Sequence, residues 1–315
     1  MNTTALVTGA TGFIGTHLVR FLLAKGWNLV GTYCVPDTEP PAQSPNVRFI
    51  QCDLRDRRRV QELFEGAQFS HIFHLGAQSL PVLSWKDPVA TFESNIMGSL
   101  HLFESIRQIK CLPIVVSACS SAEYGHVAGS DIPVKENHPL RPLHPYGISK
   151  VCLDLLAQGY SRNWNIPTIN IRLFNTTGPG KTNDAPSDFV RQLVRVKKGL
   201  QQPLIEVGNL KSRRAFLDVS DVVSGFYLAA ARGKRDQVYN LCAATTHEIG
   251  QLLRTAIKLS ELNVRVKRSS HLMRPFDEKI IFGSTQKFRR DTGWKPRLSL
   301  EQTLMSMFDY WERAT

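Results

Sequence analysis

Two polar side chains near the middle of the chain, Tyr146 and Lys150, have the types and spacing of an acid/base pair. Residues four apart share one face of a helix, so the phenol and the ammonium would be neighbours. A nearby ammonium lowers the pKa of a phenol, which would make Tyr146 a usable acid or base near neutral pH. The pattern by itself also fits an ordinary amphipathic helix start, so its meaning depends on the motifs that precede it.

Three glycines near the N-terminus, in the run Gly9-Ala10-Thr11-Gly12-Phe13-Ile14-Gly15, form a GxxGxxG pattern between an apolar strand and a helix. Gly9 permits a tight turn, Gly12 lets the backbone approach a pyrophosphate, and Gly15 lets the helix pack closely on the strand. The helix N-terminus then directs positive charge at the phosphates. A plain turn is the alternative, but the position between strand and helix predicts a dinucleotide site.

Two later segments agree with a dinucleotide. Asp53 ends a strand in QCDL, where its carboxylate can accept a hydrogen bond from an adenine amino group, and HLGAQ ends another strand with small residues. The residues that we expect to contact the cofactor are Gly9, Thr11, Gly12, Phe13, Ile14, Gly15, Asp53, Leu54, Leu75, Ala77, Tyr146 and Lys150.

The choice between NAD(H) and NADP(H) stays open. A carboxylate at the end of the second strand would bind the ribose 2′-hydroxyl of NAD, and an arginine there would accept the 2′-phosphate of NADP. This chain has Gly31-Thr32-Tyr33-Cys34 instead; Asp37 comes late, and Arg55, after the third strand, could reach a phosphate. Neither cofactor is excluded, and NADP(H) is slightly preferred.

A parallel β-sheet must position these motifs, because the first half of the chain alternates strands and helices. Asp87 and Pro88 suit the N-cap and first position of one long helix. Ligands of such sheets bind beyond the carboxyl ends of the strands, where residues 119–125, CSSAEYG, would lie. We expect strands at 5–10, 27–33, 46–54, 71–77, 113–119, 168–175 and 237–243, and helices at 12–26, 87–110, 187–199 and 299–311.

The expected fold is α/β, a Rossmann-type doubly wound parallel sheet with a smaller C-terminal substrate-binding lobe. Residues 1–175, with returning segments at about 215–242, would form the dinucleotide-binding domain, and residues 176–214 and 243–315 the smaller lobe.

Composition bounds the classes of function. The 315 residues are 42% hydrophobic, enough for a sizeable core. The formal net charge is +12 and the sequence pI about 9.6, which is compatible with nucleic-acid binding. The basic residues are dispersed, however, and the run Arg57-Arg58-Arg59 fits a solvated helix face. A nucleotide diphosphate also suits a basic protein, so we expect no nucleic-acid partner.

Cysteine usage and hydropathy predict a cytoplasmic protein. The six cysteines include no CxxC pair, as expected for reduced thiols, and neither they nor the histidines cluster at metal-ligand spacing. No stretch approaches 18 apolar residues, and the start MNTTALVTGA lacks the pattern of a signal peptide. We therefore expect no bound metal and no membrane association.

The motifs TGATGFIG, SSAEYG and PYGISK, in this order and spacing, resemble the extended short-chain dehydrogenase/reductase family that acts on nucleotide sugars, over essentially the whole chain. The resemblance implies that Ser120, Tyr146 and Lys150 form the active site. Ser120 would hydrogen-bond the reacting sugar oxygen, Tyr146 would exchange its proton, and Lys150 would hold the cofactor ribose. It also implies a homodimer formed by a four-helix bundle from the helices that begin at Pro88 and Tyr146.

The same resemblance bears on the type of reaction. Dehydratases of the family carry a glutamate two residues before the tyrosine of SxxxYG, whereas Glu123 stands one residue too late. A one-residue shift in an extended segment turns the side chain to the opposite face, so we expect Glu123 to be structural or to contact a substrate hydroxyl. Further substrate contacts are implied for Gln78, Ser121, Asn175, Arg214 and Arg274, the two arginines clamping the diphosphate; Ala215 departs from the family's usual RDF.

The resulting hypothesis is an NAD(P)H-dependent 4-ketoreductase of a GDP-4-keto-6-deoxy-hexose, of the kind that converts GDP-4-keto-6-deoxymannose to GDP-rhamnose. A GDP-mannose 4,6-dehydratase and a nucleotide-sugar 4-epimerase are the enzyme alternatives, and Ser120, Tyr146 and Lys150 suit an epimerase equally well. The non-enzyme alternative is a cofactor-sensing or RNA-binding protein on the same fold.

Overall fold

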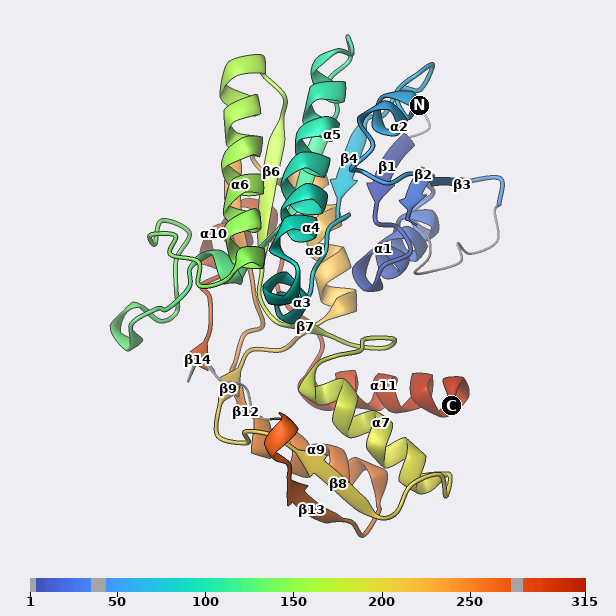
Figure 1. Cartoon of the computed structure of the whole chain (residues 1–315), viewed down its shortest axis with the longest axis vertical. Helices are drawn as coiled ribbons and strands as arrows, with labels where there is room; N and C mark the ends of the chain where they lie inside the picture. Colours follow the sequence, from blue (N-terminus) through green and yellow to red (C-terminus); the bar gives the residue numbers. More distant parts are fainter. Residues whose placement is uncertain (1–3, 35–43, 273–279) are drawn as a thin grey trace. The chain divides into compact units, whose positions relative to one another are not determined.

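Seven parallel strands form the central sheet of the computed structural model, which describes residues 4–34, 44–272 and 280–315 (Figure 1). Every neighbouring pair of strands is parallel, which confirms the predicted Rossmann-type sheet. In spatial order the strands are β11 (Gln237–Leu241), β6 (Thr168–Leu173), β5 (Ile114–Ser120), β4 (His71–His74), β1 (Thr4–Thr8), β2 (Asn28–Tyr33) and β3 (Val47–Gln51).

The strand order places a topological switch point between β1 and β4. The chain runs outward from β1 through β2 to β3, and then crosses β1 to continue with β4, β5, β6 and β11. In open α/β sheets, ligands bind beyond the carboxyl ends of the strands at such a point. Thr8 and His74 are the last residues of the two strands concerned, so the site is expected next to them.

Helices connect these strands, and the helix predicted over 87–110 contains a π-helical turn. Asp87 caps it as predicted, because its carboxylate accepts a hydrogen bond from the Ala90 N–H (2.9 Å), with Pro88 in the first turn. The helices of this part are α1 (Phe13–Ala24), α2 (Arg57–Glu62), α3 (Pro81–Lys86), α4 (Pro88–Phe92), the π-turn η1 (Glu93–Met97), α5 (Gly98–Arg107), the 3₁₀ turns η2 (Ser121–Glu123) and η3 (Gly129–Asp131), α6 (Pro145–Trp164), α8 (Val219–Arg232) and α10 (Gln286–Thr292).

The strands are almost continuously apolar because both faces of a parallel sheet are covered by helices. Leu6 and Ile72 of the strands and Phe103 of α5 are completely buried in one core cluster. Leu153 and Ala157 of α6 belong to the same cluster. The core therefore anchors α6 against the sheet, and the carboxyl ends of the strands and the first turns of α6 are held on one scaffold.

Packing divides the chain into two units, and their boundaries differ from the expected ones chiefly at residues 215–222 and 284–294. The larger unit comprises Met1–Leu173, Val223–Leu241 and Ser284–Trp294; the smaller comprises Phe174–Val222, Cys242–Gly283 and Lys295–Thr315. Residues 284–294 pack with the larger unit because α10 lies against β11. That the units bind cofactor and substrate respectively stays a prediction.

The smaller unit has a core of its own. Its helices α7 (Ala185–Lys197), α9 (Ile249–Ser260) and α11 (Leu300–Ala314) pack against one another around Leu193, Leu252 and Met307. Its other elements are β7 (Thr176–Thr177), β8 (Leu204–Val207), β9 (Arg213–Arg214), β10 (Leu217–Asp218), β12 (His247–Glu248), β13 (Arg265–Arg268), β14 (Ile280–Ile281) and the 3₁₀ turn η4 (Ser270–Leu272). Among the helices in the described ranges, none has the length and apolar character needed to cross a membrane.

Candidate active site

The glycine loop between β1 and α1 leaves no room for a side chain at Gly9 or at Gly15. Gly9 has φ +66°, and a Cβ there would lie 2.8 Å from the Gly76 Cα. A Cβ on Gly15 would lie 2.1 Å from the Gly9 carbonyl oxygen, so helix and loop are in direct backbone contact. Gly12 occupies the N-cap of α1 and offers no capping side chain. This cradle fits the pyrophosphate of a dinucleotide, as the sequence predicts.

Buried polar side chains fasten the loop after β4 to the end of β1. The Thr8 Oγ1 accepts hydrogen bonds from the N–H groups of Leu75 (3.1 Å) and Gly76 (3.0 Å). It is also hydrogen-bonded to the His74 Nδ1 (2.8 Å), whose ring reaches Ser99 of α5 through Nε2 (2.9 Å). Burial lowers the pKa of His74 to about 3, so the imidazole is neutral. The expected cofactor contacts Leu75 and Ala77 thus lie in a fixed loop beside the glycine cradle.

Asp53 and Arg55 form an ion pair at the far end of the expected cofactor site. The Arg55 Nη2 lies 2.6 Å from the Asp53 Oδ2, and the Arg55 N–H donates to the Asp53 Oδ1 (2.9 Å). The hydrogen bonds from Arg55 hold the pKa of Asp53 below its usual value. Arg55, considered above as a phosphate contact, is therefore engaged by Asp53 in this structure. Leu54 packs beside the same loop, since a Cβ on Gly76 would meet its Cδ1 at 2.9 Å, and Asp37 lies outside the described residues.

The structure brings Ser120, Tyr146 and Lys150 together at the carboxyl end of β5. Tyr146 and Lys150 lie in the first turns of α6, and Ser120 is the last residue of β5. A hydrogen bond joins the side chains of Ser120 and Tyr146. The Lys150 Nζ donates to the Ala118 carbonyl oxygen (2.8 Å) and lies 5.9 Å from the centroid of the Tyr146 ring. The three side chains can therefore act on one bound group.

The electrostatics of Tyr146 differ from the expectation that Lys150 would lower its pKa. Burial raises the pKa of Tyr146 to about 12, and the hydrogen bond with Ser120 acts in the opposite direction. Burial also lowers the pKa of Lys150. In this structure desolvation is the largest influence on the pKa of Tyr146, so near neutral pH the phenol is protonated and can donate a proton.

Asn95, which the sequence analysis did not single out, ties the site together from the π-turn η1. Its Nδ2 donates to the Ser149 Oγ (2.9 Å), and its Oδ1 accepts from the Gln78 N–H (2.7 Å). The Ser149 hydroxyl in turn donates to the Tyr146 carbonyl oxygen (2.8 Å). A buried asparagine inside an otherwise amphipathic helix was the available signal, because its amide needs partners, and π-turns are frequent at functional sites.

Two residues expected to contact substrate are instead engaged by the chain itself. The Gln78 Nε2 donates to the Leu80 carbonyl oxygen and to Thr91 (both 3.1 Å), so this amide orders its own loop. Glu123 is completely buried: its Oε1 accepts from the Ser120 N–H (2.7 Å) and its Oε2 lies 3.1 Å from the Arg172 Nε. The complete burial of Glu123 excludes a contact with substrate, so its structural alternative holds, whereas the assignment of Gln78 as a substrate contact stays a prediction.

Three of the remaining predicted substrate residues lie within the described ranges. Ser121 directly follows Ser120 in η2 and is half-buried. Asn175 and Arg214 lie in the smaller unit: the Asn175 Nδ2 is buried and finds no hydrogen-bond partner among the described residues, and the Arg214 Nη1 donates to the Arg213 carbonyl oxygen (2.8 Å). Arg274 lies outside the described residues.

Relatives of the chain include reductases, epimerases and dehydratases. Among curated proteins, it is 28% identical over 311 residues to the GDP-6-deoxy-D-mannose reductase of Pseudomonas aeruginosa, covering 97% of this chain and 96% of that protein. It is also 28% identical to the UDP-glucose 4-epimerase of Streptococcus mutans, covering 93% and 91% of the two chains. These matches confirm the resemblance drawn from the motifs.

Solved structures agree over the whole length. The structure of RMD from Pseudomonas aeruginosa complexed with NADPH superposes with a TM-score of 0.87 at 25% identity and covers all of both chains. The UDP-glucose 4-epimerase of Thermus thermophilus in complex with NAD superposes with a TM-score of 0.88 at 26% identity and covers 99% of this chain and 100% of the other. A nicotinamide cofactor is thus common to both kinds of neighbour, and the glycine cradle fits it.

A family model described as GDP-mannose 4,6 dehydratase matches residues 6–307. The chain therefore belongs to the GDP-mannose 4,6 dehydratase family, and it is an NAD(P)-dependent enzyme of the short-chain dehydrogenase/reductase class that acts on nucleotide sugars.

Proposed function

We propose that this enzyme reduces the C4 keto group of a GDP-4-keto-6-deoxy-hexose, as in the conversion of GDP-4-keto-6-deoxymannose to GDP-rhamnose. The observation that carries the proposal is that the site has a group that can donate a proton, whereas the carboxyl that could serve in an elimination of water is not available for it. Tyr146 is held neutral beside Ser120, whereas the only carboxyl in the CSSAEYG segment, Glu123, is buried against Arg172. The similarity to a GDP-6-deoxy-D-mannose reductase supports the same substrate.

The residues of the site would divide the reaction between them. A bound reduced nicotinamide supplies hydride. Ser120 would hydrogen-bond the keto oxygen and polarise it, and Tyr146 would donate its phenolic proton to that oxygen as negative charge develops. Lys150, now bonded to the Ala118 carbonyl, would turn to the cofactor ribose and offset charge on the phenolate. Asn95 would keep the first turn of α6 in place through Ser149.

Substrate recognition would use residues of the smaller unit. The Asn175 Nδ2 is a buried donor that lacks a partner, and a sugar hydroxyl or phosphate oxygen would satisfy it. Arg214 and Arg274 would neutralise the diphosphate through charge-assisted hydrogen bonds. We propose NADP(H) as the preferred cofactor, supported by the similarity to a structure complexed with NADPH.

An epimerase is the second candidate function, favoured by the 28% identity to a UDP-glucose 4-epimerase. An epimerase oxidises its substrate before it reduces the intermediate, so the tyrosine must first act as a base. Tyr146 is protonated near neutral pH in this structure, so it would first have to lose its proton to act as that base. A dehydratase, after which the family is described, would need an acid where this chain has Ser121 and Ala122.

The deciding experiment follows the absorbance of the reduced nicotinamide with purified protein, GDP-4-keto-6-deoxymannose and either NADPH or NADH. Stoichiometric oxidation is expected, faster with NADPH. Conversion of GDP-mannose to the keto-sugar without added reductant would mean a dehydratase. Interconversion of UDP-glucose and UDP-galactose without net cofactor oxidation would mean an epimerase.

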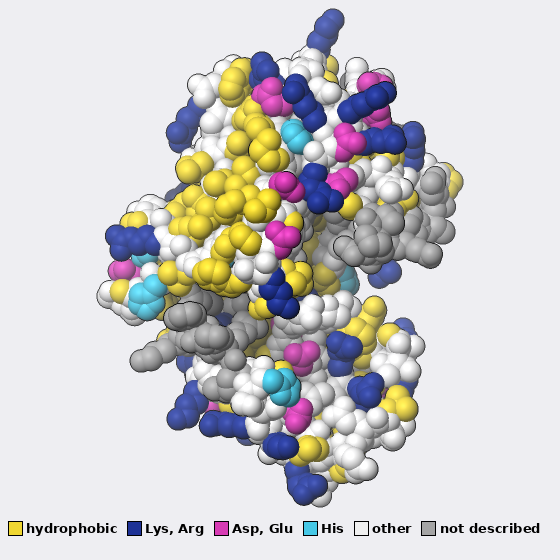
Figure 2. Space-filling model, in the orientation of Figure 1, with side chains coloured by type: hydrophobic (Ala, Val, Ile, Leu, Met, Phe, Trp, Pro, Cys, Tyr) yellow, Lys and Arg dark blue, Asp and Glu magenta, His cyan; other side chains and the backbone are white. Residues whose placement is uncertain are grey.

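We further propose that the enzyme is a homodimer in the cytoplasm. Apolar side chains gather over α3, α4, η1 and α6 on the face seen in Figure 2, and we name this set of exposed residues the bundle face: Val82, Leu83, Trp85, Val89, Met97, Ile148 and Leu155. Solvent-exposed apolar patches of this kind mark interaction sites. The cytoplasm is supported by the six cysteines, which form no disulfide in the part of the chain that the structure describes.

A further inference from the structure

Glu123 holds the turn that carries Ser120 from the inside of the protein. Its Oε1 accepts from the Ser120 N–H (2.7 Å), while the Ser120 Oγ accepts from the Ala122 N–H (3.1 Å). The two bonds form a reciprocal capping box at η2. Because Glu123 has no exposed surface, its carboxyl acts on the backbone of Ser120 and not on a ligand.

The other side of this carboxyl is connected to α6 through Arg172 of β6. The Arg172 Nε contacts the Glu123 Oε2 (3.1 Å), and its Nε and Nη2 both contact the Asp154 Oδ2 (2.9 and 2.6 Å). Asp154 follows Tyr146 and Lys150 at intervals of four residues, so all three lie on one face of α6. A chain of buried polar contacts thus runs from the backbone of Ser120 to the helix that carries its two partners.

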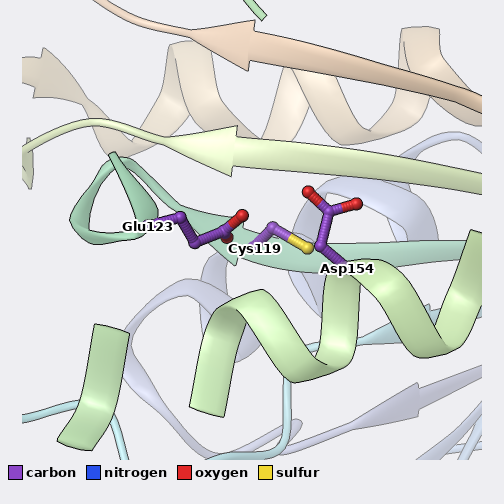
Figure 3. Close-up of side chains that lie close together, drawn as sticks. All are labelled: Cys119, Glu123 and Asp154. Carbon is purple, nitrogen blue, oxygen red and sulfur yellow. The ribbon is translucent and has the colours of Figure 1, made fainter. Parts of the chain in front are cut away.

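The charges of this cluster are balanced without a metal ion. Ligand atoms of Cys119, Glu123 and Asp154 lie within 4.8 Å of one another (Figure 3), a spacing that could hold a cation. The guanidinium of Arg172 already contacts both carboxyls and supplies the positive charge. Burial and the neighbouring Asp154 raise the pKa of Glu123 well above its usual value, which opposes a second negative charge in the cluster.

We propose that Glu123 is a positioning residue of the reaction: with Arg172 and Asp154 it fixes the distance between the hydroxyl of Ser120 and the acid/base pair on α6. The proposal rests on the proposed function, because it assigns Ser120 a contact with the reacting oxygen. A misplacement of about 1 Å can lower turnover by about 100-fold, so such a link has kinetic consequences.

Two substitutions at Glu123 distinguish this positioning role from a general contribution to packing. Glu123→Gln keeps the shape of the side chain and an acceptor for the Ser120 N–H, so kcat should stay within about threefold of wild type. Glu123→Met keeps the volume but removes the acceptor, and it leaves the contact between Arg172 and Asp154 in place, so the protein should fold. We expect kcat to fall about 10- to 100-fold with KM and the cofactor Kd little changed.

A double-mutant cycle with Ser120→Ala tests whether Glu123 acts through Ser120. If it does, adding Glu123→Met to Ser120→Ala should lower kcat by less than about twofold further. The matched control is Gln302→Ala, which removes the equivalent capping-box bond, Gln302 Oε1 to the Ser299 N–H (2.9 Å), at the start of α11. It should leave kcat unchanged. The proposal would be overturned if the losses of kcat caused by Ser120→Ala and Glu123→Met multiplied in the double mutant. It would also be overturned if Glu123→Gln and Glu123→Met lowered kcat equally.

Hydrogen exchange at the Ser120 amide provides a readout that needs no turnover. Exchange should stay slow in Glu123→Gln and become at least about tenfold faster in Glu123→Met. A wild-type exchange rate of the Ser120 amide in Glu123→Met would show that this carboxyl does not hold the turn. Fast exchange of the same amide in Glu123→Gln would show it as well, and this second result can be obtained even if the Met variant does not fold. If the wild-type enzyme reduces no keto-sugar, the proposed function fails while this readout still decides the anchoring.

Discussion

Burial affects the pKa values of single residues at this site more strongly than their neighbours along the sequence do. Tyr146 and Lys150 are four apart on α6, yet burial raises the pKa of the phenol and lowers that of the ammonium. Removing water penalises the charged form of each group, and the centroid of the ring lies 5.9 Å from the Lys150 Nζ. The apolar surroundings therefore keep the proton on Tyr146 until a ligand changes them.

Tyr146→Phe should fold and bind cofactor but lose about 10²–10⁴-fold in kcat, because a positioned proton donor contributes that much. The measurement is steady-state reduction of the keto-sugar, with cofactor affinity from nicotinamide fluorescence. Tyr310→Phe, the same change on the exposed surface of α11, is the control and should keep full activity. Near-normal turnover of Tyr146→Phe would remove Tyr146 from the mechanism.

At the level of elements, backbone contacts between loops shape the cofactor cradle. The loops after β1 and β4 approach so closely that only glycine fits at Gly9, against Gly76. Thr8 and His74 then fix the two loops to each other and to α5. The cradle is thus a property of three elements in contact.

Gly9→Ala should lower cofactor affinity by at least about tenfold, since its Cβ would lie 2.8 Å from the Gly76 Cα and force the loops apart. Gly26→Ala is the matched control: Gly26 also has positive φ (+79°), but within residues 4–34, 44–272 and 280–315 nothing lies within 4 Å of the added Cβ. Both variants should lose about 1 kcal/mol to backbone strain. NADPH titration and thermal unfolding would separate the two effects, and equal cofactor affinities would refute the steric argument.

His74 should make the protein sensitive to acid. Its pKa is about 3 in the folded chain and near 6.5 when unfolded, so between these values the unfolded state binds the extra proton. The free energy of unfolding should therefore fall as pH falls from about 6.5 towards 3, by up to about 1.4 kcal/mol per pH unit from this one group.

A His74→Gln variant should show a smaller slope of unfolding free energy against pH over the same window, whatever its stability at neutral pH. Urea unfolding at several pH values, followed by both fluorescence and circular dichroism, would measure it. Identical slopes for the two proteins would mean that His74 is not buried in its neutral form.

At the level of the whole molecule, the larger unit carries an apolar face that its own fold does not cover. Val89 is 65% exposed and Leu155 is 56% exposed, and both belong to the bundle face. A second copy that covered this face would bury these side chains, whereas the dispersed positive charge favours solubility elsewhere.

Val89→Lys or Leu155→Lys should weaken the dimer at least about tenfold, because each would bury an unpaired ammonium at the interface. Sedimentation velocity or light scattering across a concentration series would measure this. Leu200→Lys, a residue of similar exposure (54%) in the smaller unit, should leave the oligomeric state unchanged. A wild-type enzyme that stays monomeric at tens of micromolar would contradict the proposal.

Local sequence patterns determined much of the fold and the membership of the site. Apolar strands alternating with helices predicted the parallel sheet, because strands covered on both faces must be apolar throughout. The glycine pattern predicted the cradle because backbone proximity excludes side chains. The order of the SSAEYG and PYGISK motifs identified Ser120, Tyr146 and Lys150, which the structure brings together.

The tertiary structure alone decided what the buried polar residues do. The direction of the Glu123 side chain, the use of the Gln78 amide within its own loop and the role of Asn95 in the π-turn depend on partners that are distant in sequence. Arg172 stands in an apolar strand, which signals buried partners but does not name them. Desolvation and long-range hydrogen bonds are set only when the elements pack, so neither the partners nor the high pKa of Tyr146 could be obtained from spacing along the chain.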